Sequence, residues 1–105
     1  MCKGVCMNES NQTIEARCRE MVNLIQAFTD GKIKFDGLVR GLENGINGMI
    51  GFAEAEWLNE VRSIWGQLEI IYALVLDEER SVTSAEHGLI DDTLLEMAAM
   101  LSPYD

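Results

Sequence analysis

The chain contains a single proline, Pro103, and a single histidine, His87, among its 105 residues. A lone proline near the C-terminus leaves long segments free to form helices, because proline inside a helix removes a backbone hydrogen bond and clashes with the preceding turn. The alternation of β-branched with polar residues that is typical of half-buried strands is also missing. These absences argue against a β-sheet. One histidine also excludes a di-iron bundle, which needs paired Glu-x-x-His motifs.

Cysteine is scarce and confined to the first fifth of the chain, at Cys2, Cys6 and Cys18. An odd number of clustered cysteines does not fit a disulfide scaffold. A structural metal site needs four ligands at suitable spacings, and here one C-x3-C pair is followed by a single distant cysteine with no histidine nearby. We therefore expect no metal and no other cofactor. Residues 1–9 are interpreted as a flexible N-terminal extension. Because Met7 begins a sensible reading frame, we expect residues 1–6 to be dispensable for folding.

Long hydrophobic runs are also missing, since no stretch of about 20 apolar residues is present and the first residues are too polar for a signal peptide. These observations predict a cytoplasmic protein that does not enter a membrane. Hydrophobic residues make up 48% of the chain, with a mean hydropathy of +0.01, which is too high for a disordered chain despite the net charge of -10. A chain of this length is typical of one domain, which we place at residues 10–105.

Apolar residues recur at helical spacing in four segments that are separated by short polar links. We place the helices from about Ser10 to Asp30, from about Phe35 to Ile50, from Trp57 to Leu76 and from Thr83 to Ser102. Short links favour antiparallel neighbours. The sequence therefore predicts an all-α fold, a four-helix antiparallel bundle with a long central third helix.

The third helix carries both tryptophans on one continuous apolar stripe. Its second half is apolar nearly all round, with Glu69 as its one charge, so we expect other helices or a partner to cover that half completely. In the fourth helix, Thr83 and Glu86 fit a capping box. Leu89 is predicted to lie on the core face of that helix, together with Ile90.

Four glycines, Gly37, Gly41, Gly45 and Gly48, lie close together on one side of the second helix. Each interior glycine costs roughly 1 kcal/mol of helix stability relative to alanine. Three interpretations stay open: close packing against another helix, a loop that begins near Asn44, or a mobile helix that adjusts to a partner. A membrane dimer motif is excluded because charged residues interrupt the apolar positions.

Basic residues are few beyond the first two helices. Residues 1–40 carry a net charge of +1, whereas residues 41–105 carry thirteen acidic side chains and only Arg62 and Arg80 as basic ones. Nucleic acid is therefore excluded as a direct ligand, because binding phosphate demands the opposite charge. A basic protein is the expected partner.

The candidate partner-binding residues are mostly carboxylates near the third and fourth helices. Asp92 and Glu96 lie one turn apart away from the core face, a like-charge pair that weakens a helix slightly. Leu95 adds an apolar group that can become desolvated in an interface. The alternative interpretation is a solvated acidic face that serves solubility. The full predicted set is Glu69, Asp77, Glu78, Glu79, Asp91, Asp92, Leu95 and Glu96.

Two segments, Leu24 to Phe35 and Trp65 to Ala73, resemble small helical bacterial immunity proteins of the colicin D-like and contact-dependent growth inhibition families. The resemblance lies in the pattern of apolar and turn residues. It implies a protein that binds a cognate toxin, often a tRNA-cleaving or other nuclease, and blocks its basic active-site cleft. No individual inhibitory residue carries over.

Two other functional classes stay open. A helical nucleotide pyrophosphatase would hold magnesium with clustered carboxylates, for which Glu56, Glu60, Asp77 and Glu79 are the candidates, but their spacing does not match that chemistry. His87 has no serine or cysteine placed as its nucleophile, so we expect no enzymatic activity. The remaining rival is a structural or regulatory interaction module, including a homodimer formed through the second half of the third helix.

Overall fold

The computed structural model describes the backbone of residues 2–104 and the side chains of residues 12–104. It contains four helices, α1 (Cys2–Thr29), α2 (Phe35–Gly48), α3 (Ala55–Asp77) and α4 (Ser84–Leu101), and ends in a short 3-10 turn, η1 (Ser102–Tyr104). No strand occurs between residues 2 and 104. The predicted all-α class is therefore confirmed.

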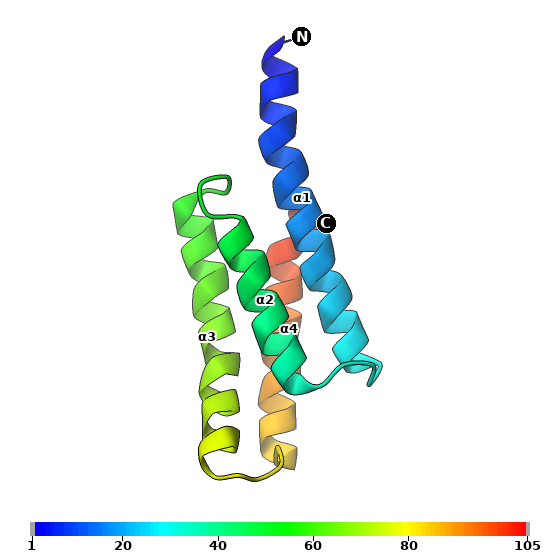
Figure 1. Cartoon of the computed structure of the whole chain (residues 1–105), viewed down its shortest axis with the longest axis vertical. Coiled ribbons are helices and arrows are strands. Elements are labelled where there is room, and N and C mark those ends of the chain that lie inside the picture. The colour runs from blue at the N-terminus through cyan, green and yellow to red at the C-terminus, as the bar shows by residue number, and fades with distance from the viewer. Residues whose placement is uncertain (1, 105) are drawn as a thin grey trace.

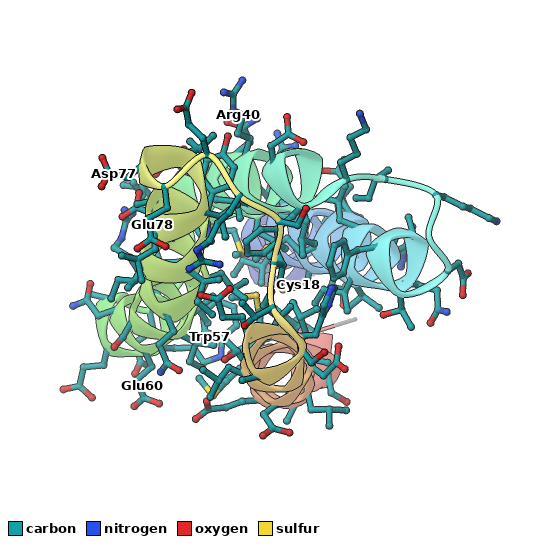
Figure 2. The ribbon with its side chains drawn as sticks, turned by 90° about the horizontal axis from the view of Figure 1, so that it is seen from below. Cys18, Arg40, Trp57, Glu60, Asp77 and Glu78 are labelled. Carbon is teal, nitrogen blue, oxygen red and sulfur yellow. The ribbon has the colours of Figure 1, made fainter. Side chains whose placement is uncertain are left out.

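The helices run alternately down and up, so that each lies antiparallel to the next (Figure 1). Consecutive helices pack against each other, and α4 closes the ring against α1. The view along the bundle in Figure 2 shows α1, α2, α3 and α4 at the corners of a quadrangle. The first turns of α1 project beyond the end of the other three helices (Figure 1). The predicted antiparallel bundle is thus confirmed, with α3 as a long third helix of 23 residues.

The start of α1 differs from the prediction, because the helix begins at Cys2 and not near Ser10. A capping side chain stabilises a helix start by only about 1 kcal/mol, and no proline precedes Ser10 to prevent earlier turns from forming. The side chains of Cys2 and Cys6 lie outside the described residues, and the dispensability of residues 1–6 stays a prediction. The predicted stop is confirmed, since Gly31 has a φ of 77° directly after the helix.

The core lies between the four helices and contains residues from each of them. The buried apolar side chains are Ile14, Cys18, Met21, Leu38, Val39, Leu42, Ile46, Met49, Leu58, Val61, Ile64, Trp65, Leu68, Ile71, Ile90, Leu94, Met97 and Leu101. Both tryptophans also cross-link α3 to a neighbour, because Trp65 Nε1 donates to the Val39 carbonyl at 2.9 Å and Trp57 Nε1 donates to the Met100 carbonyl at 3.2 Å. The second bond satisfies a carbonyl in the last turn of α4, where intrahelical donors are lacking.

Three of the glycines in α2 line its contact with α1. A Cβ atom added at Gly45 would lie 2.5 Å from Met21 Cγ, and one at Gly41 would lie 2.6 Å from Leu24 Cδ1. The helix continues through Gly45 to Gly48, so the interpretation of a loop beginning near Asn44 is wrong. The glycines instead let two helix backbones approach closely, as the packing interpretation predicts.

The second half of α3 is only partly covered, contrary to expectation. Ile70, Leu74 and Leu76 are 63%, 44% and 58% exposed. The reason is geometric: α3 packs against α2 and α4 alone, and two neighbouring helices cover only one side of a cylinder. Within the described part of the chain, no helix is long and apolar enough to cross a membrane.

Alanine substitutions at two helical glycines test the close contact between α1 and α2. We expect Gly45→Ala to lower the free energy of unfolding by roughly 1–2 kcal/mol, because the clash with buried Met21 outweighs the gain in helix propensity. The matched control is Gly66→Ala in α3, where an added Cβ meets nothing within 4 Å. It should raise the free energy of unfolding by roughly 0.5–1 kcal/mol. Urea denaturation measures both, and equal stabilisation by the two variants would contradict the close packing.

Candidate functional site

The link between α3 and α4 begins with a residue in an unusual backbone conformation. Glu79 has a φ of 51°, the left-handed region that glycine favours. Its N–H donates to the Leu76 carbonyl, and the Arg80 N–H donates to the Val75 carbonyl, both at 3.2 Å, which closes the end of α3. A non-glycine residue in this region costs roughly 1–2 kcal/mol. The Glu79 carboxylate is therefore held at a position where a glycine would fit with less strain.

Arg80 clamps this link. Its Nη1 and Nη2 atoms donate to the two carboxylate oxygens of Glu86 at 2.7 and 2.8 Å, and its Nε donates to Glu78. Glu86 also completes the predicted capping box with Thr83. The hydrogen bonds from Arg80, followed by that from the Thr83 N–H, lower the pKa of Glu86 from 4.5 to about 2. Bonding to the two carboxylates raises the pKa of Arg80 above its ordinary value.

All eight residues of the predicted set are exposed, but the structure does not bring them to a single site. Glu78 is paired with Arg80, which it shares with Glu86, so one cation only partly compensates the two carboxylates. Figure 2 shows Asp77 at the outer edge of α3, at the end of the helix that leads into the link. Glu69 lies four residues after Trp65, which contacts α2, and this spacing places Glu69 on the side of α3 that adjoins α2.

The residues of α4 divide between its two flanks. Asp91 and Leu95 line a groove with Val22 and Ile25 of α1. Thr93 marks the opposite flank, because its Oγ1 lies 3.5 Å from Gln67 Oε1 of α3. Glu96 follows Thr93 by three residues and shares this α3-facing flank. Asp92 lies between the two flanks and points outward.

Three exposed apolar side chains lie on the solvent-facing sides of α3 and α4, and we call them the α3–α4 apolar patch: Ile70, Leu74 and Leu89. On α3, Ile70 and Leu74 follow Gln67 by three and seven residues, and on α4 Leu89 precedes Thr93 by four. Because the helices are antiparallel, all three lie on the same side of the Gln67–Thr93 contact, toward the link. The exposures are 63% for Ile70, 44% for Leu74 and 58% for Leu89.

The prediction that Leu89 lies in the core is thus wrong. It precedes buried Ile90 by one residue, a rotation of about 100° that carries it out of the core, while the polar Thr93 is buried in its place. The hydroxyl of Thr93 donates to the Leu89 carbonyl at 2.7 Å, which satisfies it inside the helix. The one sequence feature that could have indicated an exposed Leu89 is its position next to the core stripe of α4 and not within it.

Carboxylates border the α3–α4 apolar patch on both helices. Asp77 follows Leu74 by three residues, and Asp92 and Glu96 follow Leu89 by three and seven. Among residues 12–104, none of these three carboxylates forms an ion pair. The arrangement is an apolar centre with an acidic rim.

The carboxylates considered for magnesium do not converge. Glu60 and Asp77 are separated by roughly 25 Å along α3, given a rise of about 1.5 Å per residue. Among the side chains of residues 12–104, no three His, Cys, Asp or Glu residues are placed to hold a metal ion together.

Comparison of the chain with protein-family models, with curated proteins and with solved structures finds no match. The similarity to immunity proteins therefore rests on the residue pattern alone. The surface of the chain itself is the basis for inferring what it binds.

The Arg80 clamp makes stability depend on pH in a defined direction. Because Glu86 has a lower pKa in the folded chain than the ordinary 4.5, its contribution is complete above pH 4.5 and is lost as the pH falls toward 2. We expect Glu86→Gln to lower the urea midpoint at pH 6 and to approach the midpoint of the unmodified chain near pH 2.

Arg80→Gln should remove most of the same pH dependence, because it deletes the partner that lowers the pKa of Glu86. Urea titrations monitored by circular dichroism between pH 2 and 7 measure both variants. A Glu86→Gln variant whose midpoint stays equally far below that of the unmodified chain at every pH would contradict the clamp.

Proposed function

We propose that this chain is a non-enzymatic binding protein that engages a basic protein partner through the face formed by α3 and α4. The observation that carries the proposal is the α3–α4 apolar patch with its rim of Asp77, Asp92 and Glu96. Following the sequence resemblance, the specific partner we propose is a nuclease toxin whose basic cleft the acidic face covers. The chain would then act as an immunity protein.

Such a surface matches the anatomy of tight protein interfaces. A desolvated apolar centre supplies most of the binding energy, and a polar rim excludes water and sets the orientation. Carboxylates at the rim attract a basic partner over long range and raise its association rate. A nuclease cleft carries Lys and Arg side chains for phosphate groups, and these cations would pair with the rim once the substrate is excluded.

The charge of two rim residues can be reversed by substitution without altering the core. We expect Asp92→Lys with Glu96→Lys to weaken partner binding by at least about tenfold, since each reversal replaces attraction with repulsion across the interface. Both side chains are exposed, so the thermal midpoint should stay nearly unchanged. The matched control is Glu15→Lys with Glu43→Lys, which changes the net charge equally on α1 and α2 and should leave binding nearly intact.

The partner to test is a basic C-terminal toxin domain encoded in the reading frame beside this one. Co-expression with the unmodified chain should restore growth, and calorimetry should show a complex of one chain with one toxin domain. The Asp92→Lys, Glu96→Lys variant should fail in both measurements. A neighbouring frame without such a domain, or full protection by this variant, would overturn the immunity proposal.

A homodimer is the second candidate, because a second copy placed on the α3–α4 apolar patch would cover the exposed Ile70 and Leu74. The two candidates respond to salt with opposite sign. Two copies with a net charge of -10 each repel one another, so salt strengthens a dimer, whereas it weakens a complex with a basic partner. Sedimentation at low and high salt measures this. We expect a monomer at both, and a dimer that grows with salt would favour self-association.

A further inference from the structure

A second surface lies between α1 and α4, on the other flank of α4 from the α3–α4 apolar patch. It is a groove of about 450 Å³ whose apolar lining comes from Val22, Ile25, Leu94, Leu95 and Ala98. In Figure 2 this side of the bundle lies at the lower right, between α4 and α1. Leu95 is 71% exposed, the highest value among the large apolar side chains with exposed surfaces. The groove is therefore open to solvent along an apolar strip.

The walls of the groove have helical spacing. On α1 the lining residues run from Val22 to Thr29, and on α4 they run from Asp91 to Ala98. Each wall is about two helical turns long, or roughly 10 Å. A strip of this length between two antiparallel helices matches the apolar face of a short amphipathic helix with anchors at i, i+3 or i+4, and i+7.

The charge of the groove indicates which kind of helix it takes. Asp91 is the only charged lining residue, and its carboxylate has no hydrogen bond or ion pair with the described residues. The nearby Gln26 amide is already engaged, because its Nε2 donates to Asp30 Oδ1 at 3.0 Å. With a net charge of -10, the chain repels acidic segments and further copies of itself. A cationic side chain is the complement that Asp91 lacks.

We propose that the α1–α4 groove binds a basic amphipathic helix of a partner protein, with apolar anchors against Leu95 and Ile25 and a Lys or Arg paired with Asp91. This site is separate from the α3–α4 face and does not depend on the toxin proposal. Binding there would complete the contact between α1 and α4, which pack less closely than the other neighbouring pairs.

Two labelled peptides of about 14 residues test the groove, since helices of this length are marginal alone and gain from docking. Both carry leucines at helical spacing, one with lysines and the other with glutamates at the remaining positions. Fluorescence anisotropy with the whole chain should show binding of the lysine peptide at least about tenfold tighter than that of the glutamate peptide. Equal binding of the two, or none of the lysine peptide, would overturn the proposal.

Variants inside and outside the groove locate the binding. Leu95→Ser should weaken the lysine peptide about tenfold, and Asp91→Asn about threefold. The matched controls, Leu76→Ser and Asp36→Asn, change the same kinds of exposed side chain outside the groove and outside the α3–α4 apolar patch with its rim. They should shift affinity by less than about twofold. Loss of binding in the controls equal to that in the groove variants would contradict the assignment.

Sedimentation of the unmodified chain separates a partner helix from a second copy. The proposal expects a monomer. A dimer that Leu95→Ser converts to monomers would show that another copy of the chain covers the groove, and would overturn the proposal. Leu95 is so exposed that its replacement should leave the fold intact, and a thermal midpoint near that of the unmodified chain verifies this.

Discussion

The close contact between α1 and α2 is the constraint on which the remaining packing depends. Gly41 and Gly45 leave the space that the side chains of Leu24 and Met21 fill, and a Cβ at either position would clash with them. An intrinsically weak helix is thereby stabilised by its contact with a neighbour. The contact of α1 with α4 is less extensive. The apolar groove lies on this less closely packed side of α1.

The pairing of α3 with α4, in contrast, is fixed at both ends. Trp57 bonds to the Met100 carbonyl and stacks edge-on against Tyr104 at a centroid distance of 5.0 Å. At the other end, Arg80 holds Glu86 through two hydrogen bonds. A face whose helices are tied at both ends loses little conformational entropy when a partner binds. The α3–α4 apolar patch therefore lies on a helix pair that side-chain contacts hold at both ends.

The sequence was sufficient for the number of helices, their antiparallel order and the capping box, because these depend on local periodicity and on caps formed by Gly31, Thr83 and Glu86. The start of α1 at Cys2 was not predicted, because no local signal opposes the extra turns. The sequence was not sufficient to predict which exposed residues share one surface of the bundle. Whether Asp91 and Glu96 share a surface depends on which neighbour each flank of α4 meets, and the apolar pattern of one helix does not contain that information. Leu89 shows the same limit, since one step of rotation separates it from buried Ile90.

The structure also changes the interpretation of the acidic residues that follow α3 in the sequence. A run of acidic residues at the end of α3 suggests one patch, yet Glu78 bonds to Arg80, which also holds Glu86, while Asp77 forms no ion pair with residues 12–104. Arg80, the single basic side chain of this region, is bound to Glu78 and Glu86 in the link. The carboxylates of Asp77, Asp92 and Glu96 therefore face solvent beside exposed apolar groups. Apolar groups alone would favour self-association, but like charges around them repel a second copy. Under the proposed function, this combination disfavours a second copy of the chain and favours a partner of opposite charge, so the acidic rim rather than the apolar centre would select the partner.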